Sequence, residues 1–406
     1  MFAATTQVFN VDAGSFLAIV ATAAIAGTLS AVAGGFGVFV PVVVVELVLG
    51  VVIGPQLLHL ADVDSFTEFF GDLGLGMLFF FAGYEIDIER IRGEPLLLGL
   101  AGWVLSLVIA YSLGGVLAAF GVVVSLVYVG SALATTAIGT LIPVLSDTGE
   151  LETDFGRYLL AAGAVGEFGP ILLLTLILSA DGTLHNAVIL VAFVALAVGV
   201  AVFAVRSAER TLPWMARTME ASGQLAVRWI VVLIFALALL AFELGLDLLL
   251  GGFAAGVITR QVLKGHELPG FESKLTAVAY GVFVPFFFVV SGMKVDIDAL
   301  FASASGVLKM LVFFVFFLVV RGMPAVLLYR RVLDERDRVT LALMCATQLP
   351  LVVAITTLAV EDHHMRTVTA AALVGAAVLS TLFFPALGLR LRGHGEEETA
   401  VAVAEV

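Results

Sequence analysis

Long apolar runs separated by short polar segments extend over nearly the whole chain. A helix that crosses a bilayer needs about 20 predominantly apolar residues, and thirteen segments come close to that length. They are residues 14–33, 36–54, 67–84, 95–120, 122–145, 156–180, 184–205, 225–243, 246–262, 275–293, 304–329, 338–360 and 366–390. This pattern predicts an all-α polytopic membrane protein with thirteen transmembrane helices.

The basic residues indicate how these helices are oriented. With the N-terminus outside, sixteen Lys and Arg side chains fall in inner segments and only Lys294 and Arg366 fall in outer ones. The positive-inside rule therefore predicts an external N-terminus and a cytoplasmic C-terminus, in the plasma membrane. The outer segments also hold eleven acidic residues, including Asp181 and Asp247. These are either ordinary solvated loops or a face that concentrates cations.

Composition agrees with the membrane assignment and excludes other classes. The chain is 61% hydrophobic and 13% charged, with a mean hydropathy of +1.13, which no soluble fold needs. Its one cysteine, Cys345, offers neither a disulfide framework nor a metal cluster. A basic nucleic-acid patch, a catalytic triad and a phosphate-binding loop are also missing from the sequence. We therefore expect neither an enzyme nor a nucleic-acid-binding protein, and we expect no cofactor.

Two similar motifs indicate an inverted repeat. "FFFAGYEIDIERI" (79–91) and "FFFVVSGMKVDIDAL" (286–300) share an aromatic triplet, a glycine and an acidic alternation. The first motif ends a helix that runs inward, and the second ends a helix that runs outward. Transporters with inverted repeats have this arrangement, and their binding site lies near the midplane, where broken helices meet. Chance resemblance is the alternative. The interpretation gives a transmembrane domain over 1–392, with repeats at about 14–180 and 225–392 and a linking helix at about 184–205, followed by a short acidic cytoplasmic tail at 393–406.

Polar residues inside four of the predicted spans fall at a similar depth. At 1.5 Å per residue, Glu167 lies roughly 15 Å from the inner end of its helix and Arg321 roughly 13 Å from the end of its own. Thr135 and Thr136 lie roughly 16 Å deep, and Gln348 lies roughly 15 Å deep. Because polar groups are unfavourable in the bilayer, this common layer predicts a functional site.

Each polar residue also has a structural interpretation. Glu167 could be a protonated acid bonded to a carbonyl, and the threonine hydroxyls could bond back to their own helix. Arg321 is too deep to reach either interface, so it needs a carboxylate or helix C-termini nearby, and it could be a structural clamp. Glu46 is mid-span, but we interpret it first as a structural acid. Gln348 and Glu46 are secondary candidates for the site.

Glycine and proline near these residues suggest where the helices unwind. "ALATTAIGTLIPVL" contains Gly139 and Pro143, and "ATQLPLVVAI" contains Pro350. Both segments are expected to be discontinuous helices that cross each other.

At these residues the chain resembles a known family. "PVVVVELVLGVVIGPQLL", "LGLGMLFFFAGYEID", "SALATTAIGTLIPVLSDTGELETDFGRYLLAAGAVGEFGPILLL", "VPFFFVVSGMKVD" and "FLVVRGMPAVLLYR" are similar to the membrane domain of Kef-type transporters, in the monovalent cation:proton antiporter superfamily. The resemblance implies a homodimer, with a dimerisation domain and a mobile core domain that moves like an elevator. It places the ion-binding acid at Glu167, the crossing-helix polar motif at Thr135 and Thr136, and the basic residue at Arg321.

The chain departs from the family pattern at the acid. The family usually has Asp preceded by Asn, Asp or Gln, whereas here Glu167 follows Gly166. The nucleotide-sensing domain of full-length Kef proteins is also absent from this chain, so no dinucleotide gating is expected from it.

These observations predict a secondary active antiporter that exchanges Na⁺ or K⁺ for protons. Glu167 would hold a proton and a cation in turn, with hydroxyls and carbonyls at Thr135 and Thr136 completing the cation shell. With one acid and a permanently charged Arg321, exchange should be electroneutral, one proton for one cation. A cation channel or leak pathway and a carrier of another small solute are the alternatives.

Overall fold

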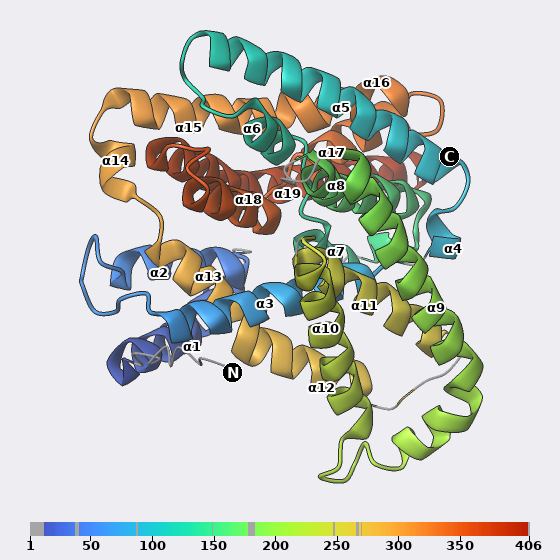
Figure 1. Cartoon of the computed structure of the whole chain (residues 1–406). Coiled ribbons are helices and arrows are strands. Elements are labelled where there is room, and N and C mark those ends of the chain that lie inside the picture. Colours follow the sequence, from blue (N-terminus) through green and yellow to red (C-terminus); the bar gives the residue numbers. More distant parts are fainter. Residues whose placement is uncertain are drawn as a thin grey trace. The chain divides into compact units, whose positions relative to one another are not determined.

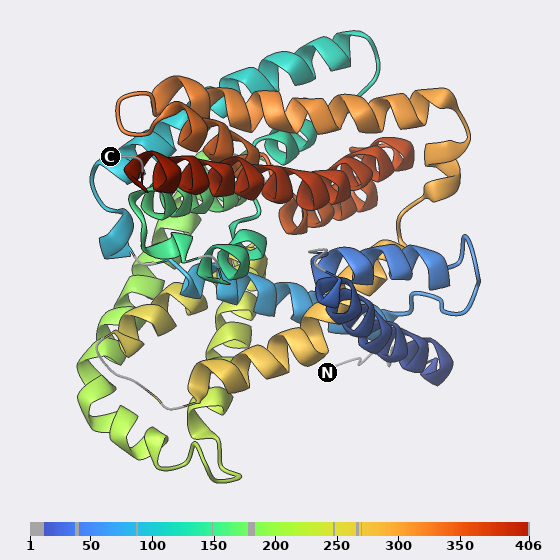
Figure 2. The same ribbon diagram turned by 180° about the vertical axis from the view of Figure 1, so that it is seen from behind.

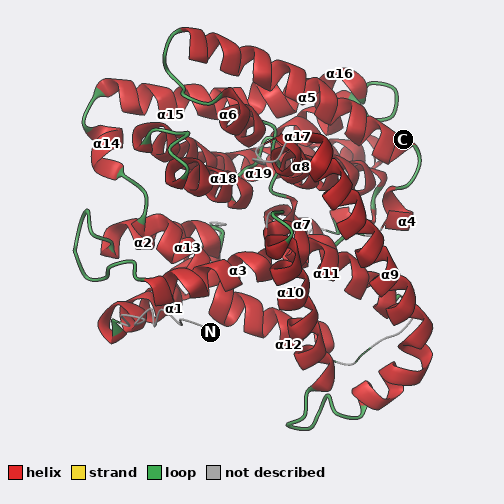
Figure 3. Ribbon diagram, viewed as in Figure 1, coloured by secondary structure: helices red, strands yellow, loops and turns green. Residues whose placement is uncertain are grey.

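The computed structural model describes residues 12–36, 40–86, 88–147, 149–177, 183–246, 248–264, 268 and 270–404. Over these residues the chain is helical, with no β-strand (Figure 3). Asp181 and Asp247 lie outside the described residues. The all-α fold class is therefore confirmed.

The chain divides into two compact units, residues 1–78 with 270–295, and residues 79–269 with 296–406. The smaller unit contains α1 (Ala13–Gly35), α2 (Val42–Ile53), most of α3 (Ser65–Tyr84), α12 (Phe271–Val278), η2 (Ala279–Phe283) and α13 (Val284–Met293). The larger unit contains α4 (Ile88–Ile91), α5 (Glu94–Ala119), α6 (Leu126–Leu133), α7 (Ile138–Asp147), η1 (Glu150–Glu152), α8 (Asp154–Ile177), α9 (Thr183–Ala216), α10 (Leu225–Glu243), α11 (Leu248–Leu263), α14 (Ile297–Phe301), α15 (Ala304–Phe317), η3 (Leu318–Gly322), α16 (Met323–Leu328), α17 (Glu335–Cys345), α18 (Pro350–Glu361) and α19 (Thr367–Ala404).

Every predicted apolar segment contains helix. In the described part of the chain, ten helical stretches are long and apolar enough to cross a membrane, and Val42–Ile53, Leu126–Ile142 and Leu248–Leu263 are shorter apolar stretches. The count of thirteen spans therefore remains a prediction. Helix α19 extends to Ala404, and the acidic tail from residue 393 remains a prediction.

Close backbone contact holds α2 against α13 in the smaller unit. A Cβ atom at Gly50 would overlap the carbonyl oxygen of Val289, and one at Gly292 would overlap that of Leu47. Small residues permit this approach between apolar helices, where packing rather than the hydrophobic effect drives association in lipid.

The larger unit is built around α8 and the broken helices. Leu141, Leu159 and Leu341, from α7, α8 and α17, are fully buried in one cluster with residues of α16. Around it, α5 packs on α6 and α8, while α19 packs on α15, α17 and α18 (Figures 1 and 2). These contacts bring the four polar spans predicted from the sequence into one unit.

Arg321 lies in a local widening of its helix. Residues Leu318–Gly322 form a π-helical turn that ends two residues before Pro324. Proline has no N–H group to donate within a helix, and single π turns are frequent at functional sites. The turn separates α15 from α16 and carries the buried guanidinium.

Candidate functional site

Two helices of the larger unit are interrupted, and their interruptions touch. Residues 134–137 separate α6 from α7, and residues 346–349 separate α17 from α18. The backbone N–H of Ala137 donates to the carbonyl oxygen of Thr347 at 2.9 Å. The predicted crossing of two discontinuous helices is therefore present.

The positions of the breaks differ in part from the prediction. Gly139 and Pro143 lie inside α7, so they are not the unwound points. The interruption falls instead at the threonine pair, whose side chains can bond to backbone groups and compete with the helix. Pro350 begins α18, the first helical position, where its missing N–H leaves no bond unmade.

Thr135, Thr136 and Gln348 connect the two breaks. The Thr135 hydroxyl donates to the side-chain carbonyl of Gln348 and to the Ala132 carbonyl. The Thr136 hydroxyl donates to the carbonyl of Cys345, the last residue of α17, at 2.6 Å. Only Thr135 bonds back to its own chain segment in the way the structural interpretation expects. All three side chains are buried.

Arg321 is buried, and each of its three side-chain nitrogens donates to a neutral group. Its Nε donates to the Thr136 hydroxyl at 2.8 Å, one terminal nitrogen donates to Ser106 at 3.2 Å, and the other donates to the Ala162 carbonyl at 3.0 Å. Within the described residues no carboxylate pairs with it. The expected carboxylate partner is thus not observed, and the expected helix C-terminus is reached indirectly, through Thr136 to the end of α17.

Glu167 lies on α8 and is 4% exposed. Its carboxyl group interacts with the backbone N–H groups of Ile138 and Gly139, in the first turn of α7. A helix N-terminus carries partial positive charge and favours an anion. The Oε2 atom is buried and has no hydrogen-bond partner. The site therefore contains a carboxylate oxygen that is available to a proton or a cation.

Gly166 explains how Arg321 fits against α8. A Cβ atom at residue 166 would overlap the Nη2 atom of Arg321 and lie 2.8 Å from the Thr136 hydroxyl. The backbone carbonyl of Gly166 also accepts from the Thr136 N–H at 3.1 Å. The absence of a side chain at residue 166 makes the space that the guanidinium occupies.

Glu46 belongs to the smaller unit, on α2. It is 3% exposed, and its Oε2 atom has no hydrogen-bond partner. The other five candidate residues all belong to the larger unit: Glu167, Thr135, Thr136, Gln348 and Arg321.

Sequence reasoning missed three hydroxyl groups that support the site. Ser106 on α5 accepts from Arg321 and donates to Gly102. Ser380 and Thr381 on α19 donate to the Gln348 carbonyl at 3.1 and 2.9 Å. Isolated small hydroxyls inside apolar helices usually bond to their own helix, so they carry little signal. The adjacent pair at 380 and 381 was the one feature that could have indicated a partner.

The arrangement suits a weakly bound alkali cation better than a transition metal. Among the described residues, no group of three or more His, Cys, Asp or Glu side chains could hold a metal ion. What the crossing offers is oxygen, from Glu167 and from the hydroxyls and carbonyls of the two breaks. Oxygen ligands of this kind can replace the hydration shell of K⁺ or Na⁺.

Comparisons with known proteins show which family the chain resembles. The profile of the transmembrane sodium/hydrogen exchanger family matches residues 19–388. YjbQ of Bacillus subtilis is 25% identical over 371 residues, 86% of this chain and 59% of that protein. The Na(+)/H(+)-K(+) antiporter GerN of Bacillus cereus is 27% identical over 267 residues, 64% of this chain and 67% of that protein.

A solved structure shares the fold. The sodium proton antiporter MjNhaP1 from Methanocaldococcus jannaschii at pH 8 superimposes with a TM-score of 0.65 at 16% identity, covering 93% of this chain and 98% of that one. With its apolar helices and the match over most of its length, the chain is an integral membrane protein, and it belongs to the transmembrane sodium/hydrogen exchanger family.

Proposed function

We propose that this chain is a secondary active antiporter that exchanges Na⁺ or K⁺ for protons, with Glu167 as the shared binding group. The observation that carries the proposal is the buried carboxyl of Glu167 at the crossing, with Oε2 unpartnered and the N-terminus of α7 beside it. Relatives in the same family are named as Na⁺/H⁺ or Na⁺/H⁺-K⁺ antiporters, which supports both candidate cations.

Competition for one carboxylate is sufficient for exchange. A proton and a desolvated cation neutralise the same charge, so Glu167 holds one or the other. The bare anion is unfavourable in a dry interior, and the loaded, neutral forms therefore cross. Hydroxyl and carbonyl oxygens of Thr135 and Thr136 would complete the cation shell after a small rearrangement of their present bonds. No cofactor is needed for this cycle.

The stoichiometry follows from Arg321 and Gly166. Guanidinium stays protonated in proteins, and Arg321 is held by hydrogen bonds on both terminal nitrogens. Because residue 166 has no side chain, the site has one titrating acid beside this fixed charge. We propose an electroneutral exchange of one proton for one cation.

The larger architecture is proposed on the same basis. We propose inverted repeats over about 14–180 and 225–392, joined by the helix at 184–205, and a core domain that moves like an elevator against a dimerisation domain in a homodimer. The paired discontinuous helices α6–α7 and α17–α18 support a repeat. The charge bias supports a cytoplasmic C-terminus in the plasma membrane, and the block at 131–174 favours the Kef-type branch of the family.

The proposal is tested by proton flux in vesicles that contain the purified chain. Na⁺, K⁺, Li⁺ or Rb⁺ is added across several pH values, and dequenching of a pH-sensitive dye reports exchange. We expect Glu167→Gln to abolish cation-driven proton flux while the protein remains folded. Glu46→Gln is the matched control, because it removes a second buried mid-helix carboxyl from the other unit, and it should retain flux.

Four results would contradict this account. Near-normal exchange in Glu167→Gln would reject Glu167 as the carrier. A steep dependence of flux on imposed membrane potential would reject electroneutral exchange. Unitary currents in a planar bilayer would favour a channel, and flux that required another solute would favour a different carrier.

A further inference from the structure

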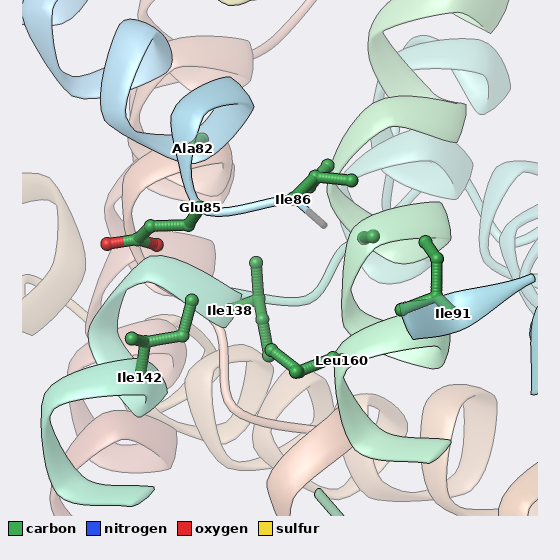
Figure 4. A pocket seen from close by; sticks show the side chains of 8 residues that line it. Ala82, Glu85, Ile86, Ile91, Ile138, Ile142 and Leu160 are labelled. Carbon is green, nitrogen blue, oxygen red and sulfur yellow. The ribbon is translucent and has the colours of Figure 1, made fainter. Parts of the chain in front are cut away.

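A small cavity lies next to the site, between the end of α3 and the first turns of α7 and α8. Its walls are apolar, with Ile138, Ile91 and Ala164 among them, except for the carboxyl group of Glu85 (Figure 4). The side chain of Glu85 extends from the segment after α3 beside α7. All lining residues belong to the larger unit.

The cavity adjoins the part of α7 that Glu167 uses. The Oε2 atom of Glu85 lies 3.9 Å from the position that a Cβ atom would take on Gly139, and the N–H of Gly139 interacts with Glu167. Ala164, in the cavity wall, precedes Glu167 by three residues on α8 and so lies roughly 4.5 Å from it along the helix axis. Two carboxyl groups therefore flank the first turn of α7, one within the site and one in the cavity.

The side of the cavity away from Glu167 lies toward the end of α3 and the start of α8. Ile91 belongs to the short helix α4, and its neighbour Arg90 pairs with Glu152, in the segment that links α7 to α8, at 3.0 Å. Arg90 and Arg157 are among the basic residues that the positive-inside rule assigns to the cytoplasm. The cavity thus lies between Glu167 and the predicted cytoplasmic ends of α3 and α8.

We propose that Glu85 is a second acidic station, which binds the transported cation on its way between Glu167 and the cytoplasm. The inference rests on the proposed antiport function and adds a residue that lies outside the crossing. An anionic group in a narrow, apolar cavity raises the local concentration of cations, and Gly139 leaves no side chain between Glu85 and the N-terminus of α7. A cation that leaves Glu85 reaches the oxygen atoms of Glu167 next.

Glu85→Gln tests this role, because it removes the charge and keeps the size of the side chain. Exchange is measured in everted and in right-side-out membrane vesicles, with the cation added in increasing concentration on one side at a time. We expect the apparent KM for Na⁺ or K⁺ to rise about tenfold when the cation enters from the cytoplasmic face. It should be unchanged when the cation enters from the outside, and Glu85→Asp should restore part of the affinity.

Glu89→Gln is the matched control. Glu89 lies four residues further along the same segment, is exposed and pairs with Lys264, and it does not line the cavity. Its substitution should leave both KM values unchanged. A rise in KM only when the cation enters from the cytoplasmic face would not arise from a merely structural role of Glu85.

Two outcomes would overturn the inference alone. If the wild type exchanges ions and Glu85→Gln has the wild-type KM from both sides, Glu85 is not on the path. An equal rise in KM from both sides would indicate a general disturbance of the site and would also overturn it. Absence of cation-driven proton flux in the wild type would instead overturn the proposed function.

Discussion

Gly166→Ala is the substitution for which the structure makes the sharpest prediction. In a helix interior, alanine is normally about 1 kcal/mol more favourable than glycine. Here the new Cβ atom would overlap Nη2 of Arg321 and lie 3.0 Å from its Cζ atom. Because the guanidinium is closely held by Thr136, Ser106 and Ala162, it cannot move away without losing hydrogen bonds. Gly166→Ala should therefore destabilise the protein, although alanine normally stabilises a helix relative to glycine.

The size of the effect follows from two contributions. Overpacking a buried site costs about 1–3 kcal/mol, and losing one hydrogen bond to a charged group costs about 1.5–3 kcal/mol. After the helix propensity of alanine is subtracted, Gly166→Ala should destabilise the larger unit by roughly 1.5–5 kcal/mol. The displaced guanidinium would also lose its present bonds to Thr136, in the break between α6 and α7, and to Ala162 on α8, so exchange should slow.

The assay compares thermal unfolding in detergent with exchange in vesicles. Gly199→Ala is the matched control, because Gly199 is also inside a long helix and a Cβ atom there would have no neighbour within 4 Å. Gly199→Ala should be neutral or slightly stabilising, whereas Gly166→Ala should unfold at a lower temperature. Equal or greater stability of Gly166→Ala, with normal exchange, would refute the packing of Arg321 described above.

Three further predictions address binding, positioning and pH. Na⁺ or K⁺ at 100 times its dissociation constant should stabilise the wild type by about 2.7 kcal/mol, seen as a higher unfolding temperature, and should not stabilise Glu167→Gln. Ser106→Ala should leave one terminal nitrogen of Arg321 without a partner and destabilise the protein by about 1–3 kcal/mol, with slower exchange; an unchanged unfolding temperature would contradict the observed bond. Hydrogen bonds from Ser15 lower the pKa of Asp12, the N-cap of α1, below its ordinary value of 3.8. A pKa that is lower in the folded than in the unfolded state stabilises the folded protein at pH values above the unfolded-state pKa, and this stabilisation is lost as the pH falls through the folded-state pKa. Asp12→Asn should therefore be less stable than the wild type at neutral pH, and the difference in stability should disappear below about pH 4.

The helices could be predicted from the sequence because lipid requires long apolar runs, but their ends could not. Helix α9 continues to Ala216, beyond the predicted end at residue 205, and includes Arg206 and Arg210. Past the apolar core of the bilayer a helix no longer needs apolar side chains, since long basic side chains reach the interface. Hydropathy therefore detects the membrane part of this helix and not its full length.

The position of the helix breaks required tertiary information. Gly139 and Pro143 are the residues of lowest helix propensity in their segment, yet both lie in α7. Propensity is a weak preference that packing overrides. At Thr136, by contrast, the backbone N–H bonds to Gly166 on α8 and the side chain bonds to Cys345 on α17, while the next residue, Ala137, bonds to Thr347 in the other break. Those partners are distant in sequence, and no local pattern reveals them.

The polar residues of the site, in contrast to the helix breaks, could be predicted from the sequence alone. A charge or amide inside a span is rare enough to stand out, and Glu167, Arg321 and Gln348 all lie where the two breaks meet. Ser106 did not stand out, because a serine in an apolar helix is ordinarily satisfied by its own backbone, as its bond to Gly102 at 2.9 Å also shows. Its second role, as acceptor for Arg321, depends on the packing of α5.

The geometry links the missing side chain at residue 166 to the charge balance of transport. A side chain at residue 166 would need the volume that the guanidinium of Arg321 fills. A carboxylate cannot occupy the same space, and Arg321 keeps its charge in every state of the cycle. If Glu167 is then the only titrating group that crosses with the cation, loading it with either H⁺ or Na⁺ changes the charge by the same amount. The same steric fact that predicts the instability of Gly166→Ala therefore also argues for electroneutral exchange, so displacement of Arg321 should disturb stability and transport together.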